Sequence, residues 1–263
     1  MGENALIKLT KTAGSLFITL LLTLLYFYHS SGKQLPSGPC RPHAKPQLSH
    51  QVVAPTLNGA KTKNVTTKKI TSKPLQADFA KAGINPKVLR LGLRAYSNAR
   101  KKGVAKRPIL TIVDYTKPST ARRLWVLDLR RHRVLFNDYV THGKNSGGKY
   151  AKSFSNALGS LKSSLGVFLT ESTYQGKHGY SLKIRGLDKR FNNKAEERSV
   201  VFHKSNYATE RYLKQRGQLG RSWGCFAVSP KIASSLISTI KDGSLVFAYY
   251  PDPSWLRTSK FLH

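Results

Sequence analysis

The residues best suited to chemistry surround one cysteine. Cys225 lies in residues 220–230, which read GRSWGCFAVSP, and is one of only two cysteines in the chain. A thiol in this place is open to four interpretations: a small buried hydrophobe, half of a disulfide, a metal ligand or a nucleophile. Gly224 permits a tight turn, and the N–H groups of such a turn can hold a developing oxyanion. These local features support two of the interpretations equally, that Cys225 is a nucleophile and that it is a small buried hydrophobe.

The expected surroundings of Cys225 favour its thiolate form. We expect a helix shortly after the cysteine, with Ser229 as its cap and Pro230 as its first residue. The N-terminus of a helix carries partial positive charge, which stabilises a thiolate. Arg221 lies close in sequence and is expected to act in the same direction.

The disulfide and metal interpretations have less support. Cys40 lies in a proline-rich stretch, LPSGPCRPHAKP, without folded context, so a bridge to Cys225 is disfavoured. A tetrahedral metal site needs about four ligands, whereas the chain has no Cys-x-x-Cys pair and no closely paired histidines. We therefore expect neither a metal nor a cofactor.

A cysteine nucleophile needs a base, and three histidines are candidates. His203 ends the expected strand SVVFH, His142 ends another and precedes a glycine-rich loop, and His178 lies in a loop between two strands. Ser222 is placed to hydrogen-bond the site or the substrate. Carboxylates are scarce, and no pair of them is spaced for acid–base work. The spacing alone leaves the choice of base open.

Strands are expected to position these side chains. Partly alternating β-branched and aromatic residues predict strands over 109–114, 122–129, 133–142, 165–170, 180–186, 199–203 and 244–250. Helices are expected over 74–83, 85–103 and 229–243. The sum predicts a mainly β (α+β) domain, a sandwich or open barrel with a few helices.

The chain is predicted to have four parts. An apolar run follows Lys8 and Lys11, so residues 1–29 are expected to be a signal peptide or membrane anchor. Residues 30–74 are rich in Pro, Lys and Thr and predict a flexible basic linker. A helical extension over 75–104 and a domain over 105–258 complete the chain. Export of either kind places the folded part outside the cytoplasm.

The charge balance is extreme. The formal net charge is +33, from 45 Lys+Arg against 12 Asp+Glu. Such a field attracts polyanions, and nucleic acid, acidic lipid headgroups and the anionic polymers of a bacterial envelope all fit. The export segment, and the lack of zinc-finger, RNP and basic-leucine patterns, argue against nucleic acid.

Three motifs together resemble a known family. They read HGKNSG (142–147), FSNALGSLKSSLG (154–166) and GRSWGC (220–225). From about residue 109 to 255 the chain resembles the murein L,D-transpeptidase catalytic-domain family, a branch of the YkuD-like L,D-transpeptidases. The resemblance implies the YkuD-like fold, Cys225 as nucleophile, His203 as its activating base, and Ser222 and Gly224 as the frame around the cysteine. It also implies a substrate-binding region formed by Arg221, His142, Gly143, Asn145 and Ser146.

The implied activity is that of a cysteine-dependent L,D-transpeptidase. A thioester would form on peptidoglycan stem peptides with release of D-Ala, and a second stem or water would resolve it. The stems would be the partners, with no nucleic acid, and the N-terminal segment would contact the membrane. The expected location is the bacterial cell envelope, either periplasmic or anchored in the inner membrane and facing outward. An L,D-carboxypeptidase and a non-catalytic cell-wall-binding protein are the alternatives.

The chain departs from the family pattern beside both proposed catalytic residues. Lys204 follows the histidine where the wider superfamily commonly has glycine. Phe226 and Ala227 follow the cysteine where proline and arginine, respectively, are expected. These departures bear on substrate preference more than on reaction class.

Overall fold

The computed structural model describes residues 73–263; the predicted anchor and nearly all of the predicted linker lie outside them. The helices are α2 (Lys73–Ala80), α3 (Pro86–Lys101), α4 (Glu210–Arg216), α5 (Pro230–Ile240) and α6 (Pro253–Thr258). The strands are β1 (Ile109–Asp114), β2 (Leu124–Asp128), β3 (Arg133–Asp138), β4 (Gly166–Gly176), β5 (Gly179–Gly186), β6 (Val201–Lys204), β7 (Phe226–Val228) and β8 (Leu245–Tyr249). None of these helices combines the length and apolar character that a membrane span requires.

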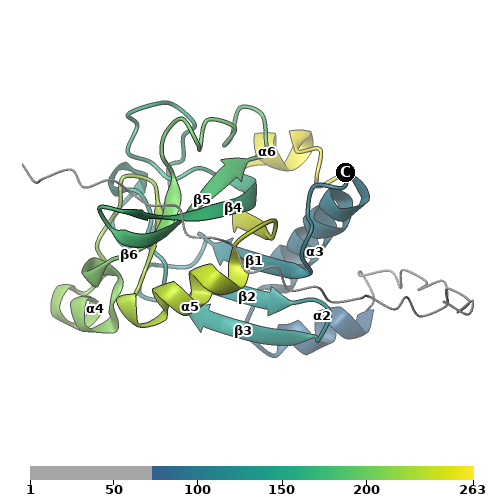
Figure 1. Cartoon of the computed structure of the whole chain (residues 1–263), viewed down its shortest axis with the longest axis horizontal. Helices are drawn as coiled ribbons and strands as arrows, with labels where there is room; N and C mark the ends of the chain where they lie inside the picture. The colour runs from purple at the N-terminus through teal and green to yellow at the C-terminus, as the bar shows by residue number, and fades with distance from the viewer. Residues whose placement is uncertain (1–72) are drawn as a thin grey trace, which may run out of the picture. The chain divides into compact units, whose positions relative to one another are not determined.

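One mixed sheet of eight strands forms the framework, in the order β3-β2-β1-β8-β4-β5-β6-β7. The β1/β8 and β6/β7 pairs are parallel, and the other neighbours are antiparallel. The chain that leaves β3 then reaches the opposite edge, where the N–H of Thr141 donates to the carbonyl of Ala227 at 3.1 Å. Gly143 bridges to Ser222 beside it. These contacts nearly close the sheet, so the predicted mainly β fold is confirmed in its open-barrel form (Figure 1).

Helices cover both faces of the sheet. Helix α3 packs its apolar side on one face, where Gly92 lets the helix backbone approach Ile112 and Phe247. Helix α5 packs on the other face, where its apolar residues belong to a buried hydrophobic cluster that includes Phe168, Phe202 and Phe226. The central strands β1, β2 and β8 are therefore buried along their whole length.

Most of the expected elements are confirmed, with differences at their ends. Asn85 caps α3 and Ser229 caps α5, each followed by a proline in the first turn as predicted. The prediction for 133–142 was wrong at its end, since β3 stops at Asp138. The prediction for 165–170 was too short, since β4 continues to Gly176. Strand β7 and helices α4 and α6 were not predicted from the sequence.

A buried carboxylate fastens the C-terminal segment to the sheet. Asp188, after β5, accepts hydrogen bonds from the Val167 N–H (2.7 Å), the Trp255 indole N–H (3.0 Å) and the Ser259 hydroxyl (2.6 Å). Gly166 has a φ of +113°, and a Cβ there would lie 2.5 Å from Asp188 Oδ2. A glycine is therefore needed where β4 begins, because the carboxylate approaches the backbone so closely.

We predict that Asp188→Ala destabilises the protein strongly. The change leaves the N–H groups of Val167 and Trp255 buried without an acceptor. Because each such loss costs roughly 1–3 kcal/mol, the free energy of unfolding should fall by about 3 kcal/mol. Chemical denaturation measures it. The matched control is Glu210→Ala, which removes an exposed pairing with Lys214 and should change the value by less than about 0.5 kcal/mol. Equal effects of the two variants would contradict the prediction.

Candidate active site

Strands β6 and β7 bring the cysteine and a histidine to one place. The two strands pair in parallel, with Phe202 opposite Phe226 and His203 opposite Ala227. Phe202 and Phe226 point into the core, where their rings stack with centroids 4.7 Å apart. Because side chains alternate along a strand, His203 and Cys225 face the other way. Both line a cavity of about 360 Å³.

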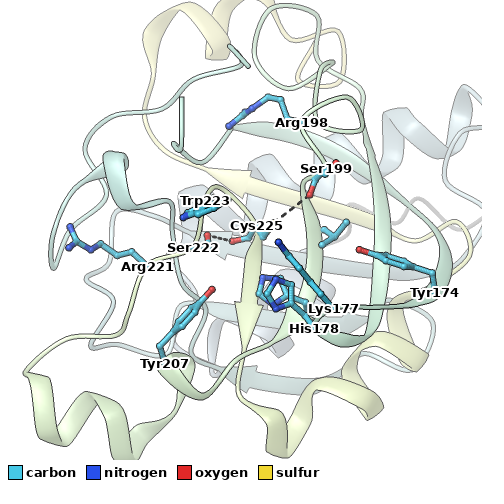
Figure 2. Close-up of a pocket in the computed structure, with 12 residues that line it drawn as sticks. Tyr174, Lys177, His178, Arg198, Ser199, Tyr207, Arg221, Ser222, Trp223 and Cys225 are labelled. Atoms are coloured by element: carbon cyan, nitrogen blue, oxygen red, sulfur yellow. Dashed lines mark hydrogen bonds between the residues drawn. The ribbon is translucent and has the colours of Figure 1, made fainter. Parts of the chain in front are cut away.

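Other segments of the chain besides these two strands also line the cavity. Ser222 and Arg221 come from the turn before the cysteine, and Lys177 and His178 from the turn between β4 and β5. The remaining lining residues are Tyr174, Arg198, Ser199, Val201, Tyr207 and Trp223. Figure 2 shows most of these side chains arranged around Cys225.

The turn that holds Cys225 is fixed by Ser222. The Ser222 hydroxyl donates to the Cys225 carbonyl (2.7 Å) and accepts from the Gly224 N–H (3.1 Å). The Ser222 backbone N–H donates to the His142 carbonyl (2.9 Å). Gly224 has a φ of +124°, and a Cβ on it would lie 2.8 Å from the Lys162 carbonyl oxygen. Ser222 and Gly224 therefore hold the backbone of this turn in shape, while their role in catalysis stays a prediction.

The same bonds determine which backbone donors face the cavity without a partner. The Gly224 N–H, an expected oxyanion donor, already donates to Ser222. The Cys225 N–H has no hydrogen-bond partner among the described residues. Of the N–H groups of Gly224 and Cys225, that of Cys225 is therefore the one available to a ligand oxygen.

A backbone carbonyl sets the tautomer of His203. The ring Nδ1 lies 2.9 Å from the Lys204 carbonyl oxygen and must donate to it, so Nε2 carries the lone pair of the neutral ring. Burial lowers the pKa of His203; the Lys204 carbonyl opposes this shift, and the charges of His178 and Lys177 add to it. The His178 ring stacks on His203 with centroids 4.3 Å apart. His203 is thus held as a neutral imidazole.

The resting thiol is protonated, contrary to the expectation of a favoured thiolate. Burial raises the pKa of Cys225, and the Val201 N–H, Arg198 and Lys177 offset this only in part. Cys225 Sγ donates to the Ser199 carbonyl at 3.5 Å, and no hydrogen bond joins it to His203 in residues 73–263. The cysteine and histidine therefore rest as a neutral pair.

The N-terminus of α5 does not stabilise a Cys225 thiolate, so this prediction was wrong. Strand β7 separates Cys225 from Pro230, so α5 begins beyond the far end of that strand. The effect of a helix N-terminus fades within its first turn. The Arg221 side chain points away from Cys225 (Figure 2) and donates to the carbonyls of Lys144 (3.4 Å) and Gly147 (3.2 Å). The cations that act on the thiol are Arg198 and Lys177 instead.

His142 lies behind the cysteine turn and outside the cavity lining. Its Nδ1 accepts from Arg123 at 2.8 Å, and its Nε2 donates to the Gly147 carbonyl at 3.3 Å. Burial lowers its pKa to about 4, and the Arg123 charge adds to the effect. His142 is therefore neutral, and its ring supports the loop that follows it.

The other residues of this motif fasten the serine-rich loop. The Gly143 N–H donates to the Ser163 hydroxyl (3.0 Å), and the Ser146 hydroxyl accepts from the Ser163 N–H (2.9 Å). Asn145 donates to the Ser160 carbonyl at 3.0 Å. None of these residues lines the cavity. Their role in substrate binding stays a prediction.

Several residues that line the cavity were not predicted from the sequence. Lys177 and Trp223 lie on opposite sides of the cavity, with the Lys177 Nζ 5.7 Å from the centre of the Trp223 ring. Trp223 is 68% exposed, which is unusual for so large an apolar side chain. The Gly-Lys-His-Gly sequence at 176–179 was the available signal for a hairpin turn. No group of three or more His, Cys, Asp or Glu side chains in the described region gathers to hold a metal. The lack of a metal and a cofactor stays a prediction.

Comparison with known proteins identifies the family. The model of the L,D-transpeptidase catalytic domain family matches residues 80–249, which is more than half of the chain. This chain belongs to the L,D-transpeptidase catalytic domain family. No curated protein sequence matches it.

Solved structures of low sequence identity also match. An L,D-transpeptidase from Mycobacterium smegmatis is 13% identical, with 54% of this chain and 59% of that one covered and a TM-score of 0.35. An L,D-transpeptidase (Yku) from Stackebrandtia nassauensis is 16% identical, with 68% and 77% covered and a TM-score of 0.33. The helical cell shape determining protein Pgp2 from Campylobacter jejuni is 10% identical, with 60% and 55% covered and a TM-score of 0.38. This chain thus matches less than two thirds of the mycobacterial structure.

We predict that the alkylation of Cys225 by iodoacetamide requires a pH high enough to convert its protonated thiol into the reactive thiolate. Because burial raises its pKa, the alkylation rate should rise with pH and reach half its maximum above about 8.5, the ordinary value for cysteine. Peptide-level mass spectrometry follows Cys225 separately from Cys40, and a free thiol peptide in the same mixture serves as reference. Half-maximal alkylation below about 7, as in thiols paired with an imidazolium, would contradict the neutral pair.

Proposed function

We propose that this protein is a cysteine-dependent L,D-transpeptidase that acts on peptidoglycan stem peptides through a thioester. The family acts on peptidoglycan. The observation that carries the proposal is the pairing of β6 with β7, which lines one cavity with a free thiol and a histidine held as a neutral base. A buried structural cysteine would need neither a cavity nor such a neighbour.

Acylation begins with proton removal, because the thiol rests protonated. Cys225 Sγ attacks the carbonyl carbon of the third stem residue while His203 Nε2 takes the thiol proton. The S–C bond forms and the carbonyl becomes an oxyanion, to which the Cys225 N–H donates. The C–N bond to D-Ala then breaks, and His203 returns the proton to the departing amine. The product is a thioester on Cys225 and free D-Ala.

A second nucleophile resolves the thioester. The amine of another stem attacks the thioester carbonyl, His203 accepts the amine proton, and the thiolate leaves and is protonated again. The result is a cross-link between two stems. Attack by water gives a tripeptide and makes the enzyme an L,D-carboxypeptidase. A protein that binds the wall without cleaving it is the third candidate.

The charge of the chain agrees with this substrate. Stem peptides carry carboxylates, and no Asp or Glu is among the residues that line the cavity. The net charge of +33 suits a polyanionic wall. We further propose that the domain works in the bacterial cell envelope, tethered through the predicted linker to the predicted anchor or released after its removal.

We predict that Cys225→Ser abolishes D-Ala release from tetrapeptide muropeptides and that His203→Gln slows it by about 10²- to 10⁴-fold. Mass spectrometry measures the D-Ala released and the products. Cross-linked dimers indicate transfer, tripeptide alone indicates hydrolysis, and binding without any product indicates a wall-binding protein.

The matched control is His132→Gln. His132 is exposed on the β2–β3 hairpin, where it pairs with Asp78 at 3.2 Å, and its replacement should leave the rate unchanged. Full activity in Cys225→Ser would contradict the nucleophile assignment. Full activity in His203→Gln would contradict the base assignment.

A further inference from the structure

The turn between β4 and β5 lies directly over the catalytic histidine. Gly176 pairs with Gly179, so Lys177 and His178 form the tip of the hairpin. The His178 ring stacks on His203 with an interplanar angle of 22°. This contact couples the position of the hairpin tip to His203. A tilted or displaced hairpin would separate the two rings.

Lys177 extends from this tip across the mouth of the cavity. Its ammonium lies 5.7 Å from the centre of the Trp223 ring, on the turn that carries Cys225. Figure 2 shows the side chain pointing toward Cys225. It lines the same cavity as Cys225 and His203, and its charge lowers the pKa values of both.

The other two cations of the cavity are already bound to the protein. Arg198 donates to the Ser155 carbonyl (2.7 Å) and the Ser160 hydroxyl (3.2 Å), among other groups of the serine-rich loop. Arg221 donates to two backbone carbonyls and points away from the thiol. Lys177 forms no hydrogen bond or ion pair within the described region, so its N–H groups remain available to a ligand.

The chemistry of the substrate places an anion at this position. In a stem that ends in D-Ala, the terminal carboxylate lies two bonds from the nitrogen of the bond that is cleaved. When the carbonyl carbon reaches Cys225 Sγ, this carboxylate must lie within a few ångströms of the thiol. No acidic residue lines the cavity to compete for a cation there.

We propose that Lys177 binds the terminal carboxylate of the acyl donor and thereby selects stems whose D-amino acid ends in a free acid. This inference rests on the proposed function. The departing residue carries the bound carboxylate away, so Lys177 is free again when the second nucleophile enters. Trp223 restrains the lysine stem from the opposite wall through its cation–π contact.

The first test compares two donors with the full-length chain. One is a tetrapeptide stem with a free terminal carboxylate, and the other is the same peptide ending in a carboxamide. The wild-type kcat/KM should be about 10- to 100-fold higher for the acid than for the amide, because a charge-assisted hydrogen bond usually contributes that much to binding. Lys177→Gln should lower kcat/KM for the acid at least tenfold more than for the amide, so that the preference for the acid is lost. Lys177→Arg should restore most of the preference.

The matched control is Lys183→Gln on the same hairpin. Lys183 lies over Tyr174 at 5.8 Å from the ring centre, as Lys177 lies over Trp223, but it does not line the catalytic cavity. The preference for the acid should persist in this variant. Equal losses on acid and amide in Lys177→Gln, or no loss on either, would overturn the proposal.

A second test does not depend on enzymatic activity. Iodoacetate, which carries a negative charge, and iodoacetamide, which is neutral, both alkylate Cys225. The ratio of their rates therefore reports how strongly the site attracts a carboxylate. A change in the thiol pKa affects both rates and cancels in the ratio. Lys177→Gln should lower the ratio about tenfold, and an unchanged ratio would overturn the proposal. Absence of D-Ala release by the wild type would instead reject the proposed function, while the alkylation ratio would still test Lys177.

Discussion

The parallel pairing of β6 with β7 is the constraint on which the site depends. Its register faces Phe202 and Phe226 into the core and leaves His203 and Cys225 on the cavity side. The same short strand receives the segment that follows β3, which nearly closes the sheet. The core packing that holds the barrel together therefore also determines the relative positions of the thiol and the imidazole.

The electrostatics of the site resolve an apparent conflict in the sequence. A chain with a net charge of +33 would be expected to stabilise a thiolate strongly. Burial outweighs the cations, and it raises the pKa of Cys225 while it lowers that of His203. A neutral pair suits a mechanism in which the base removes the proton only during attack. Of the three cations of the cavity, Lys177 is the one that the proposed mechanism leaves to bind an anionic substrate.

The sequence predicted most of the fold because its periodicity and capping signals are strong. Asn85, Pro86, Ser229 and Pro230 begin their helices as expected, and the β-branched runs form strands. It failed at β7, a three-residue strand whose pairing depends on a partner distant in sequence. The mistaken helix argument for Cys225 followed from that omission. Lys177 was missed for a similar reason, since only the tertiary fold brings the β4–β5 turn opposite Trp223.

The most direct test of the central claim is to locate the covalent adduct formed when the full-length chain reacts with a carbapenem. A β-lactam carbonyl is an acyl donor that a catalytic thiol opens and retains. Peptide mapping by mass spectrometry should find the adduct on Cys225, and its rate of formation should fall in His203→Gln. An adduct on another residue, or none while Cys225 remains accessible to iodoacetamide, would contradict the account.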